Sequence, residues 1–190
     1  YYNIELIHIN NNKNQLEVYN KKESKLESLK NISERYDGYN NSIKRVMEKK
    51  SSNKGIIGVV SDIISTKKDY EIAIETALGG NIQNIVTKDE DCAKEMVAYL
   101  KKNRYGRATF LPLTAVKGRG LKSEVPLSEK GVIGIASTLV DNDKKYDDVV
   151  SYLLGRVVVV DNIDNAIKVA KNNNYSLHIV TLEGEYLSPG

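Results

Sequence analysis

Tryptophan is absent from this 190-residue sequence, and cysteine and histidine are almost absent. The single cysteine, Cys92, excludes an internal disulfide framework and indicates a reducing compartment. With only His8 and His178 beside it, we expect no metal site built from histidine and cysteine. No apolar run approaches the ~18 residues that cross a bilayer, and the polar, asparagine-rich amino terminus differs from a secretory signal. We therefore predict a cytoplasmic protein with no membrane partner.

Motifs that carry catalytic chemistry are missing as well. The nearest approach to a phosphate-binding loop, at 118–123, lacks the Gly directly before Lys-Ser/Thr that such loops need. Nothing near His178 supports a Ser/His/Asp triad. Cys92 lies beside Glu90 and Asp91, whose charges disfavour a thiolate nucleophile. We predict that the chain is not an enzyme, with no catalytic residues, no metal and no cofactor.

The first 54 residues are polar, free of proline, and carry a helical repeat of apolar side chains. The repeat alternates spacings of three and four over Leu29, Ile32, Tyr36, Tyr39, Ile43 and Val46. Such spacing is typical of a coiled-coil seam, here sustained for about two and a half heptads. We expect residues 1–54 to be the end of a coiled-coil arm whose partner helix comes from outside this sequence. An amphipathic helix lying on its own domain is the alternative.

From Gly55 onward, short apolar strands alternate with amphipathic helices, and this pattern occurs twice. GVIGIASTLV at 131–140 repeats GIIGVVSDII at 55–64, at an offset of 76 residues. Three more positions repeat at the same offset: Tyr70 with Tyr146, Leu78 with Leu154, and Gly79 with Gly155. We predict an α+β fold made of two duplicated small subdomains with mixed sheets, 55–120 and 121–190.

A duplicated unit offers a specific way to protect its sheet edges. The first copy in one molecule can face the second copy in another, and a twofold axis then closes the pair with two equivalent contacts. The glycines after the helices, Gly79-Gly80 and Gly155, permit close backbone approach at such a contact, although ordinary helix C-caps also use glycine. A duplicated α/β regulatory domain that binds an anionic small molecule between the copies is an alternative. A monomeric DNA-binding module is another.

Basic residues gather in two stretches, although the net charge is only +3. Between Met96 and Ser123 there is no acidic residue, and Tyr99, Tyr105 and Phe110 are interleaved with cations. The predicted DNA contacts are Lys101, Lys102, Arg104, Arg107, Lys117, Arg119 and Lys122, with Lys49, Lys50 and Lys54 at the end of the arm. This composition favours sequence-nonspecific, salt-sensitive DNA binding through phosphates and base stacking. A solvated basic surface without a partner is the alternative.

Seven segments, in this order, resemble one known family: YDGYNNSIKRVM, GVVSDII, ETALGGNIQNIV, GRATFLPL, GVIGIASTLV, YLLGRVVVVDN and IVTLEGEYLSPG. Over residues 36–190 the chain resembles the hinge of structural maintenance of chromosomes (SMC) proteins, above all the bacterial chromosome-condensation members. The resemblance implies a homodimer in which each subdomain pairs with the opposite subdomain of the partner. It also implies coiled-coil arms that run to ATPase heads elsewhere in the parent protein, a nucleoid-associated location, and DNA contact near the hinge.

The resemblance assigns residues to the dimer interface: Gly79, Gly80, Asn81, Gly155, Arg156 and Gly184. Gly184 resembles the first residue of the family's glycine-rich dimerisation signature, and the chain stops at Gly190 before the remaining glycines. The coil that returns from the hinge would also follow Gly190. Because the sequence begins at Tyr1 rather than Met, we expect an excised fragment of a longer protein.

Overall fold

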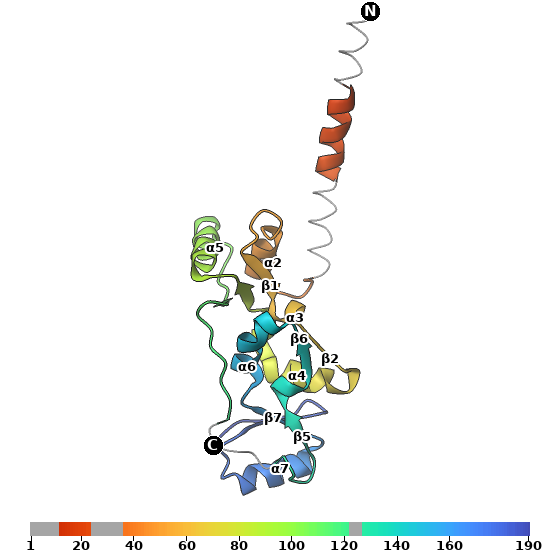
Figure 1. Cartoon of the computed structure of the whole chain (residues 1–190), viewed down its shortest axis with the longest axis vertical. Coiled ribbons are helices and arrows are strands. Elements are labelled where there is room, and N and C mark those ends of the chain that lie inside the picture. The colour runs from red at the N-terminus through yellow and green to blue at the C-terminus, as the bar shows by residue number, and fades with distance from the viewer. Residues whose placement is uncertain (1–11, 24–35, 122–126) are drawn as a thin grey trace, which may run out of the picture.

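The structure is a computed structural model that describes residues 12–23, 36–121 and 127–190. Residues 12–23 are helical and every one of them is exposed. The first unit, 36–121, contains α2 (Asn41–Glu48), β1 (Ile56–Val59), α3 (Val60–Ile63), β2 (Ile64–Thr66), the 3-10 helix η1 (Lys68–Tyr70), α4 (Glu71–Leu78), the 3-10 helix η2 (Gly79–Gln83), β3 (Ile85–Thr87), α5 (Glu90–Asn103) and β4 (Phe110–Pro112). The second unit, 127–190, contains β5 (Val132–Ile135), η3 (Ala136–Thr138), β6 (Val140–Asn142), η4 (Lys144–Tyr146), α6 (Asp147–Leu154), β7 (Val157–Val160), α7 (Ile163–Asn172), β8 (His178–Thr181) and β9 (Tyr186–Leu187). Figure 1 shows these elements in place.

The predicted duplication is confirmed element by element. The bounds of β1, β2 and α4 recur at the 76-residue offset in β5, β6 and α6. Each unit pairs its first strand antiparallel with the strand after the central helix, and that strand runs parallel to the next. Both antiparallel pairs carry an irregularity at the equivalent place, between Ile56 and Gly58 and between Val132 and Gly134. The two units are therefore copies of one α+β design.

The two copies meet through a two-stranded antiparallel sheet of β2 and β6. Ser65 pairs with Asp141, its own equivalent at the 76-residue offset, and the flanking pairs are exchanged symmetrically around it. The Ser65–Asp141 pair therefore marks a pseudo-twofold axis that relates the units within one chain. The symmetry is broken at the carboxyl end, where β9 pairs with β8 and the first unit has no counterpart strand.

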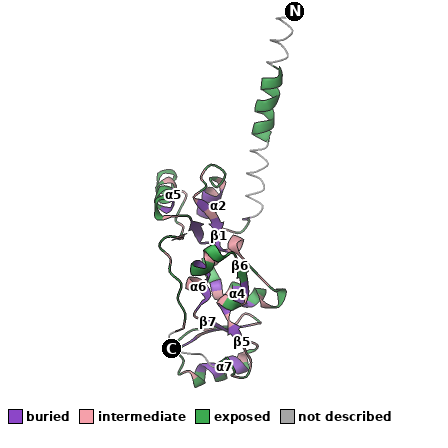
Figure 2. Cartoon of the chain, in the orientation of Figure 1, coloured by how far each residue is buried: buried purple, intermediate pink, exposed green. Residues whose placement is uncertain are grey.

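Three hydrophobic cores follow one another along the molecule (Figure 2). Successive side chains of a strand belong to neighbouring cores. In β7, Val157 and Val159 face the shared central core while Val158 and Val160 face the outer core beneath α7. Because successive side chains of a strand point to opposite faces, a run of four valines serves a sheet buried on both sides. The central core combines side chains of α4 and α6, so the two units are packed against each other.

The coiled-coil interpretation is wrong for the part of the seam that the structure describes. Residues 36–39 form a turn, in which Gly38 has φ +84°, and α2 begins only at Asn41. Tyr36, Ile43 and Val46 are buried in the outer core of the first unit, together with residues of α5. Because that core accepts the apolar face of α2, the first unit begins near residue 36 and not at 55. Two positions of the seam, Leu29 and Ile32, lie outside the described residues.

Candidate dimer interface

The first glycine corner, Gly79, Gly80 and Asn81, stands at the end of α4 and is exposed. Gly79 has φ +52° and ψ −132°, a backbone conformation that residues with a side chain rarely adopt. A Cβ placed on Gly79 or Gly80 would meet no atom within 4 Å. The corner therefore presents bare backbone to its surroundings, and none of the described residues covers it.

The second glycine corner, Gly155 and Arg156, is at the equivalent end of α6 and is covered. Gly155 is buried, and a Cβ on it would lie 2.1 Å from the carbonyl oxygen of Arg119. The covering segment, residues 118–120, is called the strap here. Ser151 Oγ donates to the Arg119 carbonyl at 3.0 Å, and the Gly118 amide donates to Asp148 Oδ1 at 2.9 Å. The strap accounts for glycine at position 155 without any partner molecule.

Two arginines are fixed at the second corner by their Nε atoms. Arg119 Nε donates to the carbonyl oxygen of Tyr152 at 2.9 Å, and its guanidinium lies 4.4 Å from the centre of the Tyr152 ring. Arg156 Nε donates to the carbonyl oxygen of Gly120 at 2.9 Å. Both side chains are thereby oriented by backbone carbonyls near the carboxyl end of α6, where cations are favoured.

Gly184 lies in the turn between β8 and β9, with φ +96°. A Cβ on it would be 3.0 Å from Ile72 Cγ2 and 3.3 Å from Thr76 Oγ1, both on α4. The structure thus brings Gly184 to the helix that ends at the first glycine corner. Ile72 remains 53% exposed on that face, a large apolar side chain that the sequence reasoning missed.

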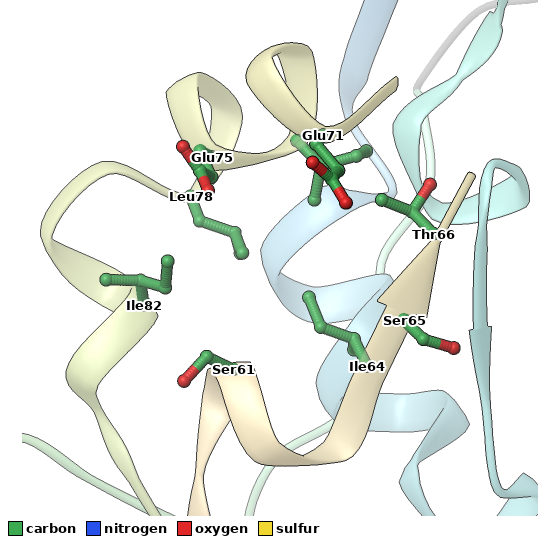
Figure 3. A pocket seen from close by; sticks show the side chains of 9 residues that line it. Ser61, Ile64, Ser65, Thr66, Glu71, Glu75, Leu78 and Ile82 are labelled. Carbon is green, nitrogen blue, oxygen red and sulfur yellow. The ribbon is translucent and has the colours of Figure 1, made fainter. Parts of the chain in front are cut away.

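A groove of about 370 Å³ runs beside the first corner, between α4, α3, β2 and η2. Figure 3 shows Ile64, Leu78 and Ile82 facing into it, with Glu71 and Glu75 projecting from α4 at its rim. All of its lining residues belong to the first unit. Hydroxyl side chains of Ser61, Ser65 and Thr66 also line it. The groove therefore extends the bare corner into a surface of mixed apolar and polar character that is acidic at the edge.

The predicted DNA-contacting residues separate into two groups in space. Lys117 and Arg119 belong to the segment along α6, and Lys122 lies outside the described residues. The others are exposed near α2 and α5, which Figure 1 shows at one end of the molecule: Lys49, Lys50, Lys54, Lys101, Lys102, Arg104 and Arg107. This second set is called the basic end here.

Two aromatic rings at the basic end are covered by cations. Arg45 lies 4.6 Å from the centre of the Tyr105 ring and Lys49 lies 5.0 Å from that of Tyr99. The two tyrosines meet edge to face at 5.6 Å, and burial, with smaller contributions from neighbouring charges, raises the pKa of Tyr99. Phe110 packs against the outer core. Each of the two tyrosine rings therefore already has a cation against it, which the sequence-based expectation of base stacking did not anticipate.

The fold agrees with that of a known family. The family model described as SMC proteins Flexible Hinge Domain matches residues 53–170, more than half of the chain. The chain belongs to the SMC hinge family. This confirms the resemblance found in the sequence, and with it the α+β fold class.

The curated relatives that the chain matches are much longer proteins, and the chain spans about 15% of their length. The Chromosome partition protein Smc of Clostridium kluyveri is 40% identical over 179 residues, which are 91% of this chain but 15% of that protein. The protein of the same name from Halothermothrix orenii is 42% identical over 173 residues, 90% of this chain and 15% of that protein. A solved asymmetric dimer of the Geobacillus stearothermophilus SMC hinge domain has a TM-score of 0.78 and 37% identity, and the match covers 92% of this chain and 72% of that one.

The thiol of Cys92, which the sequence analysis considered as a possible nucleophile, also lies in this hinge. It is buried next to Asn53 and Gly55, and burial is the main cause that raises its pKa, followed by the charges of Asp89 and Glu95. The sequence had indicated Glu90 and Asp91 as the unfavourable charges, so the neighbours differ although the direction is the same. Across the described residues of the hinge, no helix has the length and apolar character to span a membrane.

Alanine at Gly155 is expected to destabilise the hinge by about 1–3 kcal/mol, because the new Cβ would overlap the carbonyl oxygens of Arg119 and Ser151. Urea unfolding measures the change at a protein concentration below that at which the chain dimerises, so that the proposed contact at Gly80 does not contribute. The matched control is Gly80→Ala, where no atom lies within 4 Å, and we expect a change below about 0.5 kcal/mol. Equal stabilities for the two variants would contradict the close contact between the strap and α6.

Proposed function

We propose that this hinge joins two copies of its own chain into a homodimer through reciprocal contact of the glycine corners. The first corner of one copy meets the second corner of the other, and the twofold axis generates the same contact again. The observation that carries this proposal is the bare backbone at Gly79 and Gly80 beside an open groove and the exposed Ile72. A related hinge has been solved as a dimer, which supports the association of two chains here.

In the whole protein, the dimer would join two coiled-coil arms of a chromosome condensation and segregation ATPase. The hinge itself carries no catalytic step; ATP would be bound and hydrolysed by head domains in parts of the protein outside this chain. The arm that leads into the hinge would pair with the return coil that follows it. This assignment rests on the relatives named Chromosome partition protein Smc, of which the chain spans 15%. It also implies a cytoplasmic, nucleoid-associated protein.

The mass of the chain in solution tests the homodimer directly. The monomer mass is 21.2 kDa, and light scattering over a concentration series should approach twice that value. A mass that stays at 21.2 kDa up to several hundred micromolar, at low salt, would refute the proposal.

We also propose that the basic end contacts DNA without sequence preference. Support comes from seven exposed cations gathered near α2 and α5, at one end of the molecule. Such contacts neutralise phosphates and release counterions, so affinity should fall steeply as salt is raised. No base-reading element accompanies these cations in the described residues, and the tyrosine rings between them are already covered.

Changing Lys49, Lys101 and Lys102 to glutamine should weaken binding to duplex DNA and flatten its salt dependence. Each lost phosphate contact lowers the slope of log K against log salt by about 0.9. Fluorescence anisotropy at several salt concentrations measures both effects. The control changes Lys130, Lys168 and Lys171, exposed cations of the second unit, to glutamine. If both triple variants lose affinity equally, the basic end is not the DNA-binding surface.

The alternative hypothesis, that an anionic small molecule binds between the copies, is not favoured by the structure. The region between α4 and α6 is filled by the shared central core. The groove beside α4 is lined by the first unit alone and carries Glu71 and Glu75, which would repel an anion.

A further inference from the structure

We propose that opposite charges at the two glycine corners select which corners pair. In this proposal Glu71 and Glu75 of one copy receive Arg119 and Arg156 of the other. The inference rests on the homodimer proposed above and adds the partner surface and the reason for its choice. It concerns four side chains for which the described residues provide no ion pair.

The acidic side is formed by one face of α4. Glu71 and Glu75 are four residues apart, so their carboxylates lie on the same face of the helix. Both are exposed at the rim of the groove (Figure 3), above the apolar side chains of Leu78 and Ile82. Among the described residues, neither carboxylate takes part in an ion pair. A cation that enters this groove would meet two free carboxylates next to an apolar wall, where charges are screened less than in water.

The basic side is preorganised. The Nε atoms of Arg119 and Arg156 are held by carbonyl oxygens, while no described carboxylate lies within ion-pair distance of either guanidinium. An arginine fixed in this way keeps its terminal Nη donors for a carboxylate and loses little conformational entropy when it binds one. The strap places Arg119 over the second corner, whereas no described segment covers the first corner. The protruding basic surface of one copy could therefore fit against the open acidic surface of the other.

The divergence of the two copies explains why like corners would not pair. At the 76-residue offset Glu75 corresponds to Ser151, and Gly80 corresponds to Arg156. The acid nearest the first corner is thus lost in the second unit, and a cation is gained. Pairing of first corner with first corner would oppose carboxylates, and pairing of second with second would oppose guanidiniums. Like charges brought together disfavour an interface strongly, so only the reciprocal arrangement satisfies both corners.

Charges of the other sign also lie near both corners. Arg107 lines the hollow that contains Gly80, and Lys67 and Lys68 precede α4 beside Glu71. Asp147 and Asp148 stand at the amino end of α6 and keep their charges, because the amide groups that donate to them are neutral. The contrast between the corners is therefore carried by the residues nearest the glycines, Glu75 on one side and Arg156 with Arg119 on the other.

Charge reversal in two separate proteins tests the pairing. One variant carries Glu71→Lys and Glu75→Lys, and the other carries Arg119→Glu and Arg156→Glu. Each variant alone would oppose like charges at both contacts, and its dimer should be weakened about 100-fold or more. In a mixture, both contacts of the mixed dimer are again between opposite charges. Native mass spectrometry should therefore show a heterodimer where each protein alone is monomeric.

Two controls separate a charge effect from damage to the fold. Glu17→Lys with Glu23→Lys makes the same charge change on the exposed helix 12–23 and should leave the dimer intact. Arg119→Gln with Arg156→Gln removes the charge without reversing it and should weaken the dimer less than the glutamate pair. Thermal melting of every variant shows whether the strap still holds α6.

The outcomes distinguish this inference from the proposed dimer. A wild-type chain that is monomeric at every concentration refutes the homodimer itself. A wild-type dimer whose charge-reversed variants still dimerise alone overturns the charge pairing and leaves the homodimer standing. Folded variants that are monomeric alone and fail to associate when mixed also overturn it, because the opposite charges of the mixed dimer would then not restore association. Association of the Glu71→Lys, Glu75→Lys variant with wild type, in preference to either homodimer, would indicate pairing of like corners.

Discussion

Glutamate at Gly79 and Gly80 is expected to convert the hinge dimer into a 21.2 kDa monomer. Both positions are exposed backbone, and a Cβ added at either would meet no atom of the same chain within 4 Å, so any close neighbour there must belong to a partner. Two added side chains would occupy the space into which the partner's backbone must come, and overpacking of a close contact costs about 1–3 kcal/mol at each site. We expect the dissociation constant to rise by at least about 100-fold, measured by light scattering and sedimentation.

The effect on the fold must be separated from the effect on association. Gly79 has φ +52°, so a side chain there adds backbone strain of about 1–3 kcal/mol, whereas position 80 has no such restriction. Gly80→Glu alone should therefore be nearly as stable as wild type and still lose most of its dimer. Ser51→Glu with Ala98→Glu adds two charges at exposed positions of the basic end and should not affect the mass. An unchanged dimer in Gly80→Glu would place the interface elsewhere.

The duplicated fold could be predicted from sequence because its signals are local. Glycine after a helix and apolar strand residues recur at a fixed offset. The start of α5 is also set locally, because Asp89 caps that helix by accepting the Cys92 amide at 2.9 Å. Each of these features depends on neighbours a few residues away in the sequence, and the tertiary packing keeps the local structure that they favour.

The coiled-coil interpretation of the apolar repeat from Tyr36 to Val46 was wrong because two kinds of structure share the same spacing. Residues three and four apart lie on one face both in a coiled coil and in a helix packed on its own domain. Only the surroundings decide, and here α5 supplies Met96 and Leu100 to cover Ile43 and Val46. Gly38 was the available signal, since a glycine with positive φ interrupts a helix.

The role of the strap could not be predicted for a different reason. Arg119 and Tyr152 are 33 residues apart and meet through a loop that has no periodic pattern. Sequence alone grouped Arg119 with the other cations of its stretch, whereas folding places it at the end of α6. Long-range contacts of this kind decide which equivalent corner is covered and which is bare, and they leave no local signature.

Alanine at Leu78 or at its equivalent, Leu154, is expected to destabilise the whole chain by about 2–5 kcal/mol. The two side chains are 3% and 1% exposed and belong to the same central core, which α4 and α6 build together. Because that core is shared, loss of packing in one unit should weaken the other. Urea unfolding followed by circular dichroism should give a single transition, shifted similarly in both variants.

Hydrogen exchange can tell a shared core from two independent domains. If the units unfold together, Leu78→Ala should accelerate exchange in β7 of the second unit as well as in β3 of the first. Ile167→Ala, at a side chain 41% exposed on α7, is the control and should change stability by no more than about 0.5 kcal/mol. Faster exchange confined to β3 would mean that the two units fold separately. A hinge that opened one dimer contact would then gain flexibility within each chain, whereas a shared core makes each chain a rigid connector between its two contacts.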